Sequence, residues 1–542
     1  MRPAGRGEFD SLYFDYPHFD PPEGAARTRL TAPARVAIVG AGPVGMASAL
    51  ALAREGVSSV IFDAKPTLND GSRAICLARE TFYLLRRIGV LPAFEAKSLP
   101  WTTGWSYYRG QQILEFRMHD SEEELFRPMY NLEQQYTEQF LWEAVHESPL
   151  IDTRWQSEVV GLQDVDGGVE LSITDPIETY TLRADWVLAA DGAHSPMRRL
   201  RGLRLQGENY EGRYVIADVQ MAFDHPTVRL ALFDPACRPG GTVLVHKQPD
   251  NIWRIDYQLT EGKSEEEALK EENVYAAVAS VIEEIGYTGE WKLEWWSIYS
   301  ANTLALDDYR DGRIFFVGDS AHIVPIFGVR GLNNGIADAL NIGWKLGWLL
   351  NGKAGEEILD SYTPERRGAT LDVFDNAKKS TRFMTPPTPG FLLMRDAALS
   401  LALDYPFAGD LANPRNMTPY TYAESPLVEN DDTAFDGGPA PGEVLPECRL
   451  DDGYLSDHLA PWFNIFCFNP ALAGEIKLAF QDISDRDIQI SVLDFPSKEA
   501  AHLGAGENSA YLIRPDRYIA ARWKSAAAQD IRVAFNNIIC RR

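Results

Sequence analysis

The stretch that decides the fold is ARVAIVGAGPVGMASALALAREGVSSVIFDAKP, residues 34–66. It begins with an apolar strand at residues 36–39, continues through a tight turn and an Ala-rich helix to about residue 55, and closes with a second strand that ends at Asp63. This order of strand, glycine turn, helix and strand predicts a Rossmann-like nucleotide-binding unit in a chain of the α/β class.

The three glycines of the turn have separate physical tasks. Gly40 lets the chain turn sharply, Gly42 lets the backbone approach a pyrophosphate, and Gly45 lets the helix pack close to the strand. The helix N-terminus then faces the phosphates. Asp63 stands where a carboxylate can accept hydrogen bonds from both ribose hydroxyls. The turn therefore predicts a dinucleotide cradle but does not separate NAD from FAD.

Two later stretches repeat the pattern of an apolar strand, an aspartate at its end and a loop that leads into a helix. ADWVLAADGAHSPMRRL, residues 184–200, carries Asp191, Gly192 and Arg198. FFVGDSAHIVPIFGVRGLNNG, residues 315–335, carries Gly318 and Asp319. An aspartate at the end of a strand can reach a sugar hydroxyl in the crevice beyond the strand ends.

With these three motifs the chain resembles the single-component FAD-dependent aromatic hydroxylases of the para-hydroxybenzoate hydroxylase and phenol hydroxylase type. The resemblance covers about residues 35–400. It implies FAD as cofactor, NADH or NADPH as reductant and O2 as co-substrate. It also implies that the Asp191–Arg198 motif contacts both FAD and the nicotinamide cofactor, and that Asp319 binds the ribityl or ribose portion of the flavin.

The loop after Asp319 is predicted to hold the isoalloxazine ring. Its glycines, Gly328 and Gly331 among them, let the backbone press against a flat ring, and Leu332 and Asn333 offer main-chain N–H groups to the ring edge at the start of a helix. Relatives commonly place a proline just before the FG of this loop, whereas here Ile326 follows Pro325. Pro325 remains the candidate beside the reacting hydroxyl, and we expect a structural role for His322.

Two further residues are predicted to contact the same flavin. Arg73 lies in a loop before an amphipathic helix, where the resemblance implies contact with the FAD phosphates; a solvated surface arginine is the alternative. Gln134 stands just before a helix expected from about residue 136 to 145, at the position of the family's flavin-binding glutamine. Gln135 is the alternative if the register differs by one.

Residues 205–300 form a β-rich insert that the resemblance implies to be the roof of the substrate site. In WRIDYQL, residues 253–259, one face carries Trp253 and Tyr257 and the other carries Arg254 and Asp256. Alternation does not say which face meets the substrate. Arg254, Tyr257 and His246 are candidates for phenol binding, against the alternative of surface charges and core aromatics.

The remaining segments complete the predicted organisation. We expect an N-terminal arm at residues 1–33, an FAD-binding domain at 34–204 and 301–420, the substrate domain at 205–300, a linker at 421–441 and a C-terminal domain at 442–542. The last resembles the thioredoxin-like domain of larger phenol hydroxylases but has no CxxC. The apolar helix at residues 391–403 is equally compatible with a homodimer contact and with the core.

Composition limits the class of partner and the compartment. A net charge of -26 would repel nucleic acid. The N-terminus has no apolar core of signal-peptide length, and the sequence has no apolar run of 18 residues that would suggest a membrane span. The five scattered cysteines suggest neither a disulfide framework nor a metal site. We therefore expect a cytoplasmic enzyme with a small aromatic substrate.

The function these features predict is hydroxylation of a phenolic compound with NAD(P)H and O2 through a flavin C4a-hydroperoxide. Three alternatives stay open: a flavoprotein of the same fold with another outcome, such as an epoxidase, a halogenase or an oxidase; an NAD-dependent dehydrogenase; and a non-catalytic flavin-binding protein. The two downstream aspartate motifs argue against the dehydrogenase. The catalytic base is not identified by the sequence.

Overall fold

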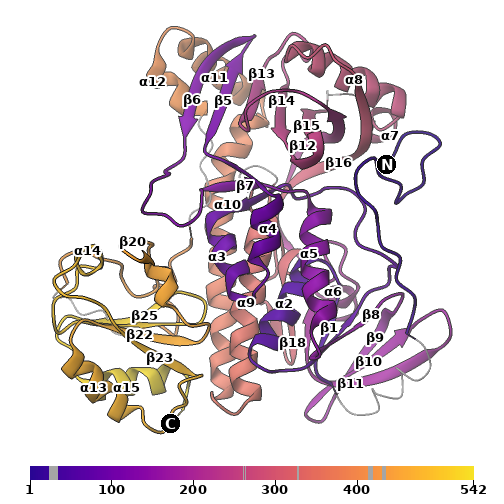
Figure 1. Ribbon diagram of the computed structural model, residues 1–542. Coiled ribbons are helices and arrows are strands. Elements are labelled where there is room, and N and C mark those ends of the chain that lie inside the picture. Colours follow the sequence, from indigo (N-terminus) through magenta and orange to yellow (C-terminus); the bar gives the residue numbers. More distant parts are fainter. Residues whose placement is uncertain are drawn as a thin grey trace.

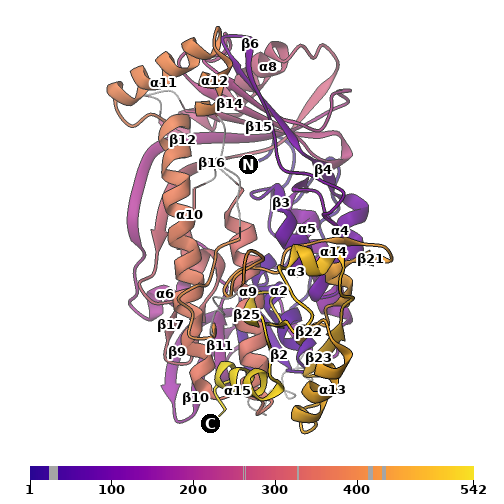
Figure 2. The same ribbon diagram turned by 90° about the vertical axis from the view of Figure 1, so that its left-hand side faces the viewer.

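The computed structural model describes residues 1–22, 34–259, 262, 264–325, 329–412, 419–429 and 435–541, apart from the side chains of residues 210, 211 and 301. The chain forms a lower α/β body, an upper sheet that covers it like a roof, and a C-terminal unit beside the lower body (Figure 1). The long helix α10 (Tyr362–Met384) runs from the lower body up to the roof (Figure 2).

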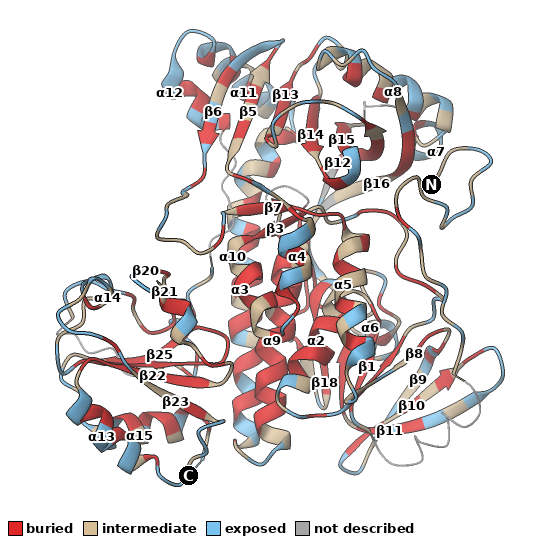
Figure 3. Cartoon of the chain, viewed as in Figure 1, coloured by how far each residue is buried: buried red, intermediate tan, exposed pale blue. Residues whose placement is uncertain are grey.

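The lower body is built on a mainly parallel sheet. Its parallel strands are, in spatial order, β18 (Ile314–Phe316), β11 (Thr179–Ala189), β1 (Ala34–Val39), β2 (Ser59–Phe62) and β8 (Ile151–Arg154). Antiparallel strands β17 (Arg310–Asp311), β9 (Glu158–Val165) and β10 (Gly168–Thr174) extend it. The core strands are almost wholly buried, as continuous apolar runs in a parallel sheet require (Figure 3).

Helices α2 (Pro43–Arg54), α5 (Gln134–Glu147) and α9 (Gly331–Leu350) pack against this sheet and against one another. Small residues allow α2 and α9 to approach closely, because a side chain at Gly343 would meet Ala51 at 2.5 Å. The predicted strand–turn–helix–strand unit at residues 34–66 is thus present, and the helix expected from about residue 136 begins two residues earlier.

The roof is an eight-stranded sheet. Its order is β19 (His322–Ile323), β16 (Trp291–Ala305), β12 (Gln206–Met221), β15 (Ile252–Gln258), β14 (Thr242–Lys247), β13 (Arg229–Phe233), β5 (Thr103–Tyr108) and β6 (Gln111–Arg117). Strands β5 and β6 come from outside the predicted insert, and β5 pairs in parallel with β13. Helices α7 (Glu265–Ala268) and α8 (Glu271–Glu284) lie on its outer side (Figure 1).

Short elements connect the two bodies. A three-stranded sheet of β3 (Cys76–Ala78), β7 (Met129–Asn131) and β4 (Leu99–Trp101) lies between them, beside α3 (Arg79–Arg87) and α4 (Leu91–Lys97). Helix α6 (Pro196–Leu200) follows β11, and α11 (Pro389–Ala402) and α12 (Pro406–Gly409) follow α10. The described helices include none with the length and apolar run that crossing a bilayer requires. No disulfide and no cluster of three or more metal-ligand side chains occurs in the described ranges.

The C-terminal unit has a four-stranded sheet in the order β23 (Ile488–Val492), β22 (Phe463–Cys467), β24 (Ala510–Ile513) and β25 (Ile519–Trp523). Helices α13 (Pro470–Ala479), α14 (Lys498–His502) and α15 (Ala528–Ile538) accompany it, and a small hairpin of β20 (Arg449–Leu450) and β21 (Gly453–Tyr454) precedes it. Buried ion pairs attach this unit to the lower body: Arg514 binds Glu365 of α10 at 2.5 Å, and Glu365 also binds Lys345 of α9 at 2.7 Å.

The N-terminal arm packs more closely than a loose surface segment. Phe14 is buried, and Phe19 stacks on Trp155 with ring centroids 4.3 Å apart. Arg2 binds Asp70 at 2.6 Å and also pairs with Glu294 of β16. The arm therefore joins the roof to the loop that precedes β3.

Candidate functional site

The ends of the parallel strands bring the three predicted motifs together. Strand β1 ends before Gly40, β2 ends before Asp63, β11 ends before Asp191 and β18 ends before Gly318 and Asp319. Since these four strands are neighbours and run in parallel, their carboxyl ends meet at one edge of the sheet. Segments that are far apart in the sequence thus form one candidate binding crevice.

The glycine turn has the geometry of a phosphate cradle. Gly40 has φ +107°, and a Cβ there would lie 2.4 Å from the carbonyl oxygen of Ala190. A Cβ at Gly45 would lie 2.0 Å from the carbonyl oxygen of Gly40. At Gly42 the nearest atom, on Asn69, would be 3.9 Å away. Two glycines are therefore required by backbone packing, while the third leaves open space where a phosphate group would lie.

Two of the predicted aspartates hold main chain as well as facing the crevice. Asp63 accepts hydrogen bonds from the N–H groups of Ala41 at 2.7 Å and Lys65 at 2.9 Å, so it fixes the glycine turn. Asp191 accepts from Met197 N at 2.8 Å with one oxygen, while its Oδ1 is buried without a partner among the described residues. Burial raises the pKa of both carboxyls. Each is positioned to accept an additional donor.

Asp319 and Arg73 are the least satisfied charged groups at this edge. The Asp319 side chain is exposed, although Gly318 and Ser320 on either side are buried. The surrounding protein nonetheless raises the pKa of its carboxyl by burial, with His322 and Arg73 opposing the rise. In the described ranges neither Asp319 nor Arg73 has a hydrogen bond or an ion pair. A carboxylate and a guanidinium held in this way fit a ligand that carries sugar hydroxyls and phosphates.

Arg198 is held by main-chain carbonyl groups. Its guanidinium donates to the carbonyl oxygens of Ser320 at 2.8 Å and Ala193 at 2.6 Å, and Ser195 caps its helix. Arg198 therefore ties the second motif to the third. Gly192 has φ +75°, and a Cβ there would have no atom within 4 Å, so this glycine borders open space.

Gln134 lies beside the loop that carries Arg73. It accepts a hydrogen bond from Ala74 N at 3.2 Å and donates to Glu138 at 2.7 Å. Glu138 in turn binds Asn69, the residue nearest to the open side of Gly42. Gln135 points elsewhere and donates to Tyr13 of the N-terminal arm. Of the two registers left open by the sequence, the structure thus places Gln134 by the crevice.

The start of α9 presents free main-chain donors. Within the described residues the N–H groups of Gly331, Leu332 and Asn333 have no acceptor, and no side chain caps this helix. The Asn333 side chain accepts from Ala78 N at 2.8 Å and donates to Val329 O at 2.7 Å, which fixes the helix start against β3. Free donors at a helix N-terminus favour an anionic group. Gly328 lies outside the described residues.

His322 is a structural residue here. It is fully buried, and its Nε2 lies 2.7 Å from Asp338, which also binds Arg366. Asp338 further accepts from Gly318 N at 3.0 Å, so this group supports the strand end before Asp319. Pro325 is buried at the end of the described part of the loop, where the carbonyl of Val324 accepts from Tyr299 of the roof at 3.1 Å.

The inner face of the roof carries a row of aligned residues that are buried except for the half-buried Arg229. Cross-strand pairing aligns one residue from each of seven neighbouring strands: Phe116, Gly104, Arg229, His246, Arg254, Asp218 and Trp295. The row faces the loop before β3, because Trp295 donates to Asp70 at 3.1 Å and Arg254 donates to the carbonyl oxygen of Ser72. The inner face of the roof therefore looks onto the crevice.

This placement changes the expectations for the roof candidates. Tyr257 lies on the outer face, in the apolar cluster under α8, so it does not share a face with the crevice. Arg254 is on the inner face, where Asp218 and Ser72 bind its guanidinium and so tie it to the loop before β3. His246 is buried on the inner face; burial first, then Arg229 and Arg254, lower its pKa to about 3. It is neutral at physiological pH.

Several polar atoms on the inner face are buried without partners in the described ranges. They are Ser106 Oγ, Tyr108 OH, Arg229 Nε, His246 Nδ1 and Asp256 Oδ1. Asp256 is next to Arg254 on β15, and burial raises the pKa of its carboxyl to about 7 despite the opposing charge of Arg254. Groups of this kind are costly unless a ligand or water satisfies them. The alternation of the sequence places Asp256 on the same face as Arg254. Which buried atoms lack a hydrogen-bond partner can be seen only in the folded structure.

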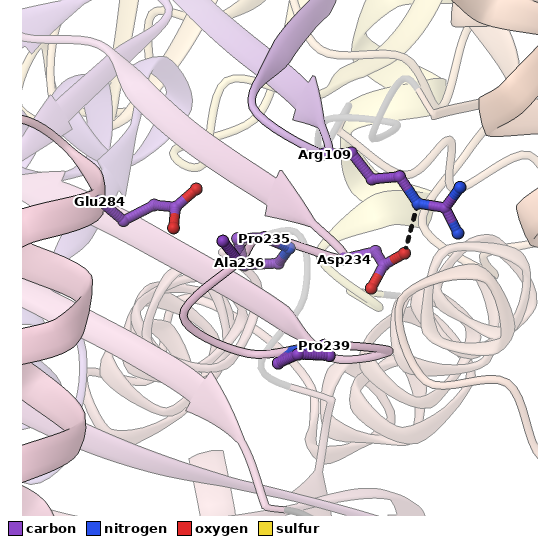
Figure 4. A pocket seen from close by; sticks show the side chains of 6 residues that line it. All are labelled: Arg109, Asp234, Pro235, Ala236, Pro239 and Glu284. Carbon is purple, nitrogen blue, oxygen red and sulfur yellow. Dashed lines mark hydrogen bonds and ion pairs between the residues drawn. The ribbon is translucent and has the colours of Figure 1, made fainter.

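Two cavities lie away from the strand ends. One of about 260 Å³ is at the rim of the roof, where Arg109 binds Asp234 at 2.7 Å (Figure 4). Its walls are Arg109, Asp234, Pro235, Ala236, Pro239 and Glu284. A second, of about 170 Å³, is close by and includes His225 and Leu230. Both belong to the outer side with α8, so we place the functional site at the crevice.

Known proteins share sequence and fold with this chain. The model of a family described as FAD binding domain matches residues 33–377. Over 92% of this chain and 95% of the relative, the chain is 27% identical to the 3-(3-hydroxy-phenyl)propionate/3-hydroxycinnamic acid hydroxylase 2 of Burkholderia vietnamiensis.

Solved structures share the fold across most of the chain. The flavin-dependent monooxygenase PieE, in complex with FAD and substrate, has a TM-score of 0.78 and 23% identity and covers 94% of this chain and 100% of its own. A ternary complex of aklavinone-11 hydroxylase with FAD and aklavinone has a TM-score of 0.75 and 21% identity, covering 94% and 99%. At these identities the structures show the arrangement of elements, which includes both sheets and the C-terminal unit.

Proposed function

The chain belongs to the FAD binding domain family, and from this premise we propose that it is an FAD-dependent monooxygenase that hydroxylates a phenolic compound with NAD(P)H and O2. Three features together carry the proposal. Asp319 follows the end of β18, and Arg73 lies in the loop before β3, both without a partner among the described residues. The start of α9 adds uncapped main-chain donors. The hydroxylase activity named for the relatives supports it.

Different residues along the crevice are suited to different parts of FAD. Asp63 is suited to the ribose, the turn at Gly42 and Arg73 to the pyrophosphate, Gln134 and Asp319 to the connecting chain, and Gly331 to Asn333 to the anionic ring edge. When bound, FAD would take a hydride from NAD(P)H and activate O2 for insertion of one oxygen atom. The roof covers the site and excludes water.

The aromatic ring must become electron-rich to accept oxygen, so a base that draws the phenolic proton is needed. Asp256 is suited to this role. Its carboxyl is buried on the crevice side of the roof, has an oxygen without a hydrogen-bond partner among the described residues, and titrates near neutral pH. Arg254 next to it lies 3.9 Å from its Oδ1 and favours the ionised form that takes the proton.

The test is to purify the protein, record its absorbance spectrum for flavin and measure NAD(P)H oxidation. We expect yellow protein whose NAD(P)H oxidation accelerates when 3-(3-hydroxyphenyl)propionate or a simpler phenol is added, and a product that contains one more oxygen atom by mass. Peroxide release without product would indicate an oxidase, and flavin without phenol-stimulated NAD(P)H oxidation would indicate a binding protein. Colourless folded protein that does not take up FAD would contradict every flavin function.

The predicted division of the chain is part of this proposal. Cores on the two sheets support an FAD-binding part and a roof, with β5 and β6 joined to the roof. The order of elements β22, α13, β23, α14, β24, β25 and α15 supports a thioredoxin-like unit at residues 442–542. Without a CxxC it has no disulfide-exchange chemistry. A cytoplasmic location and the exclusion of nucleic acid stay predictions.

A homodimer is a further part of the proposal. Helix α11 exposes Leu392, Leu393, Met394 and Leu401, and Phe407 of α12 is 70% exposed. A second copy of this chain is the occupant we propose, because a patch of low charge lets two molecules of net charge -26 meet with less repulsion than their other faces would. Sedimentation should show a dimer that Leu393→Asp converts to monomer, and a monomeric wild type would contradict it.

A further inference from the structure

Arg229 is a half-buried cation without a protein anion in the described part of the chain. Its Nε is buried without a hydrogen-bond partner, and no ion pair involves its guanidinium in the described part of the chain. The neighbouring Arg254 shows the contrast, since Asp218 binds it at 2.5 Å and Ser72 accepts from it. The protein supplies partners for the charge of Arg254 but not for the charge of Arg229.

No nearby protein group is suited to neutralise Arg229. Burial raises the pKa of the Cys76 thiol to about 12, so the residue that faces Arg229 from β3 is neutral. The cross-strand partner His246 is also neutral, and its Nδ1 is unsatisfied. Burial lowers the pKa of Arg229 itself to about 10, which still leaves it charged at neutral pH. The charge is therefore left available for an external anion.

The surroundings of Arg229 define the rest of that ligand. Its guanidinium lies over the Phe116 ring at 5.6 Å, and this ring can lie flat only because Gly104 has no side chain. Phe116, Cys76 and Val329 belong to one apolar cluster, which extends from Arg229 to the loop that precedes α9. A ligand in this place has an apolar, flat body and an anionic end.

We propose that Arg229 binds the carboxylate of an aromatic substrate and thereby selects aromatic acids over neutral phenols. The inference rests on the proposed hydroxylase function and adds the residue that sets its specificity. A guanidinium matches the two oxygens of a carboxylate with parallel hydrogen bonds, which a neutral amide or alcohol does not supply. On the same face of the roof, Asp256 lies two strands away, beside the other end of such a substrate.

The test compares an acid with its neutral analogue. Initial rates of NAD(P)H oxidation and product formation are measured with 3-(3-hydroxyphenyl)propionate and with its primary amide. In Arg229→Gln we expect KM for the acid to rise about 10- to 100-fold, the range for a lost charge-assisted hydrogen bond, and KM for the amide to change less than about threefold. Arg229→Lys should lie between wild type and Arg229→Gln for the acid.

Arg238→Gln is the matched control. Arg238 is also partly buried with a pKa lowered by burial, but it lies over Tyr257 on the outer side of the roof. It should leave both KM values unchanged. Bound flavin absorbance and thermal melting establish that each variant is folded, and Arg229→Lys carries the test if Arg229→Gln does not fold.

The outcomes separate this inference from the function on which it rests. Equal KM changes for acid and amide, or an unchanged KM for the acid in Arg229→Gln and Arg229→Lys, would overturn the role of Arg229. So would a wild-type enzyme that hydroxylates neutral phenols but shows no flavin difference spectrum with 3-(3-hydroxyphenyl)propionate. If no phenol stimulates NAD(P)H oxidation at all, the proposed function itself fails.

Discussion

The lower sheet and the roof build their parts of the site from different material. At the lower sheet the contacts are made by strand ends, glycines and main-chain donors, as at Gly40, Gly45 and the start of α9. On the roof they are made by side chains that project from strands, such as Arg229 at the start of β13 and Asp256 within β15. A cofactor site that is built from main-chain groups is specified by the local sequence. A substrate site that is built from side chains depends on which face of a sheet is covered.

The largest effect is expected where backbone meets backbone. Gly45→Ala places a methyl group 2.0 Å from the carbonyl oxygen of Gly40, which no side-chain rotation can relieve. We expect purified protein without bound FAD, measured as the ratio of flavin to protein absorbance. Gly474→Ala, where a Cβ meets nothing within 4 Å, should bind FAD normally and change stability by about 1 kcal/mol at most. Flavin-replete Gly45→Ala would contradict the main-chain account of this site.

A side chain of the roof should control chemistry without controlling the cofactor. Asp256→Asn should bind FAD but lower kcat about 10²- to 10⁴-fold. The wild-type carboxyl takes the proton only when ionised, so kcat should rise as pH increases through about 7, and this rise should be absent from the variant.

The groups around Asp256 do not produce the same pH profile. Burial raises the pKa of Cys76 and Tyr214 to about 12, while Asp218 is paired with Arg254. The pH dependence of kcat, with product quantified by mass, distinguishes a proton acceptor from a structural carboxyl. A variant that keeps the rise near pH 7 would exclude Asp256 as the base.

A smaller effect is expected for a side chain of the lower sheet that supplements the backbone contacts. Asp319→Ala should remain folded and bind FAD about 10- to 100-fold more weakly, since one charged hydrogen-bond acceptor is lost. Titration of the apoprotein with FAD, followed by flavin fluorescence, gives the Kd. Asp166→Ala, an exposed carboxylate in the turn between β9 and β10, should retain the wild-type Kd. An unchanged Kd in Asp319→Ala would remove it from the cofactor site.

The smallest effect is expected on the outer face of the roof. Tyr257→Phe removes a hydroxyl from the side that packs under α8, so KM and kcat for the phenol should stay within about twofold of wild type. Steady-state kinetics with the substrate of the previous assays measures this. A large increase in KM would show that the substrate approaches the roof from the α8 side and would reverse the assignment of its two faces.

The sequence predicted the parts of the site that rest on local constraints. A positive φ, a strand end or a helix start imposes its residue type at fixed spacing, which is why Gly40, Asp63 and Asp319 were identifiable. The turn residues also fixed the order of the elements at 34–66. Gln134 was assigned from spacing alone, and its hydrogen bond to Ala74 distinguishes it from Gln135.

The roles of the roof residues depended on distant pairing that no local pattern reveals. Alternation separates Arg254 from Tyr257 but cannot identify the covered face, and Arg254 is engaged by Asp218, 36 residues away in sequence. Arg229 has no sequence signature, because its distinction is the absence of a partner among the described residues. The same holds for β5 and β6, which join the roof through a parallel pairing with β13.

The buried ion pairs of the C-terminal unit couple its stability to that of the strand end at Gly318. Arg514 and Lys345 share Glu365, and the adjacent Arg366 binds Asp338, which supports Gly318. Separating Arg514 from Glu365 would strand charges in an apolar interior at a cost of about 3–5 kcal/mol. The C-terminal unit and the strand end at Gly318 should therefore melt in one cooperative transition, and FAD bound to this chain should raise the temperature at which both are lost.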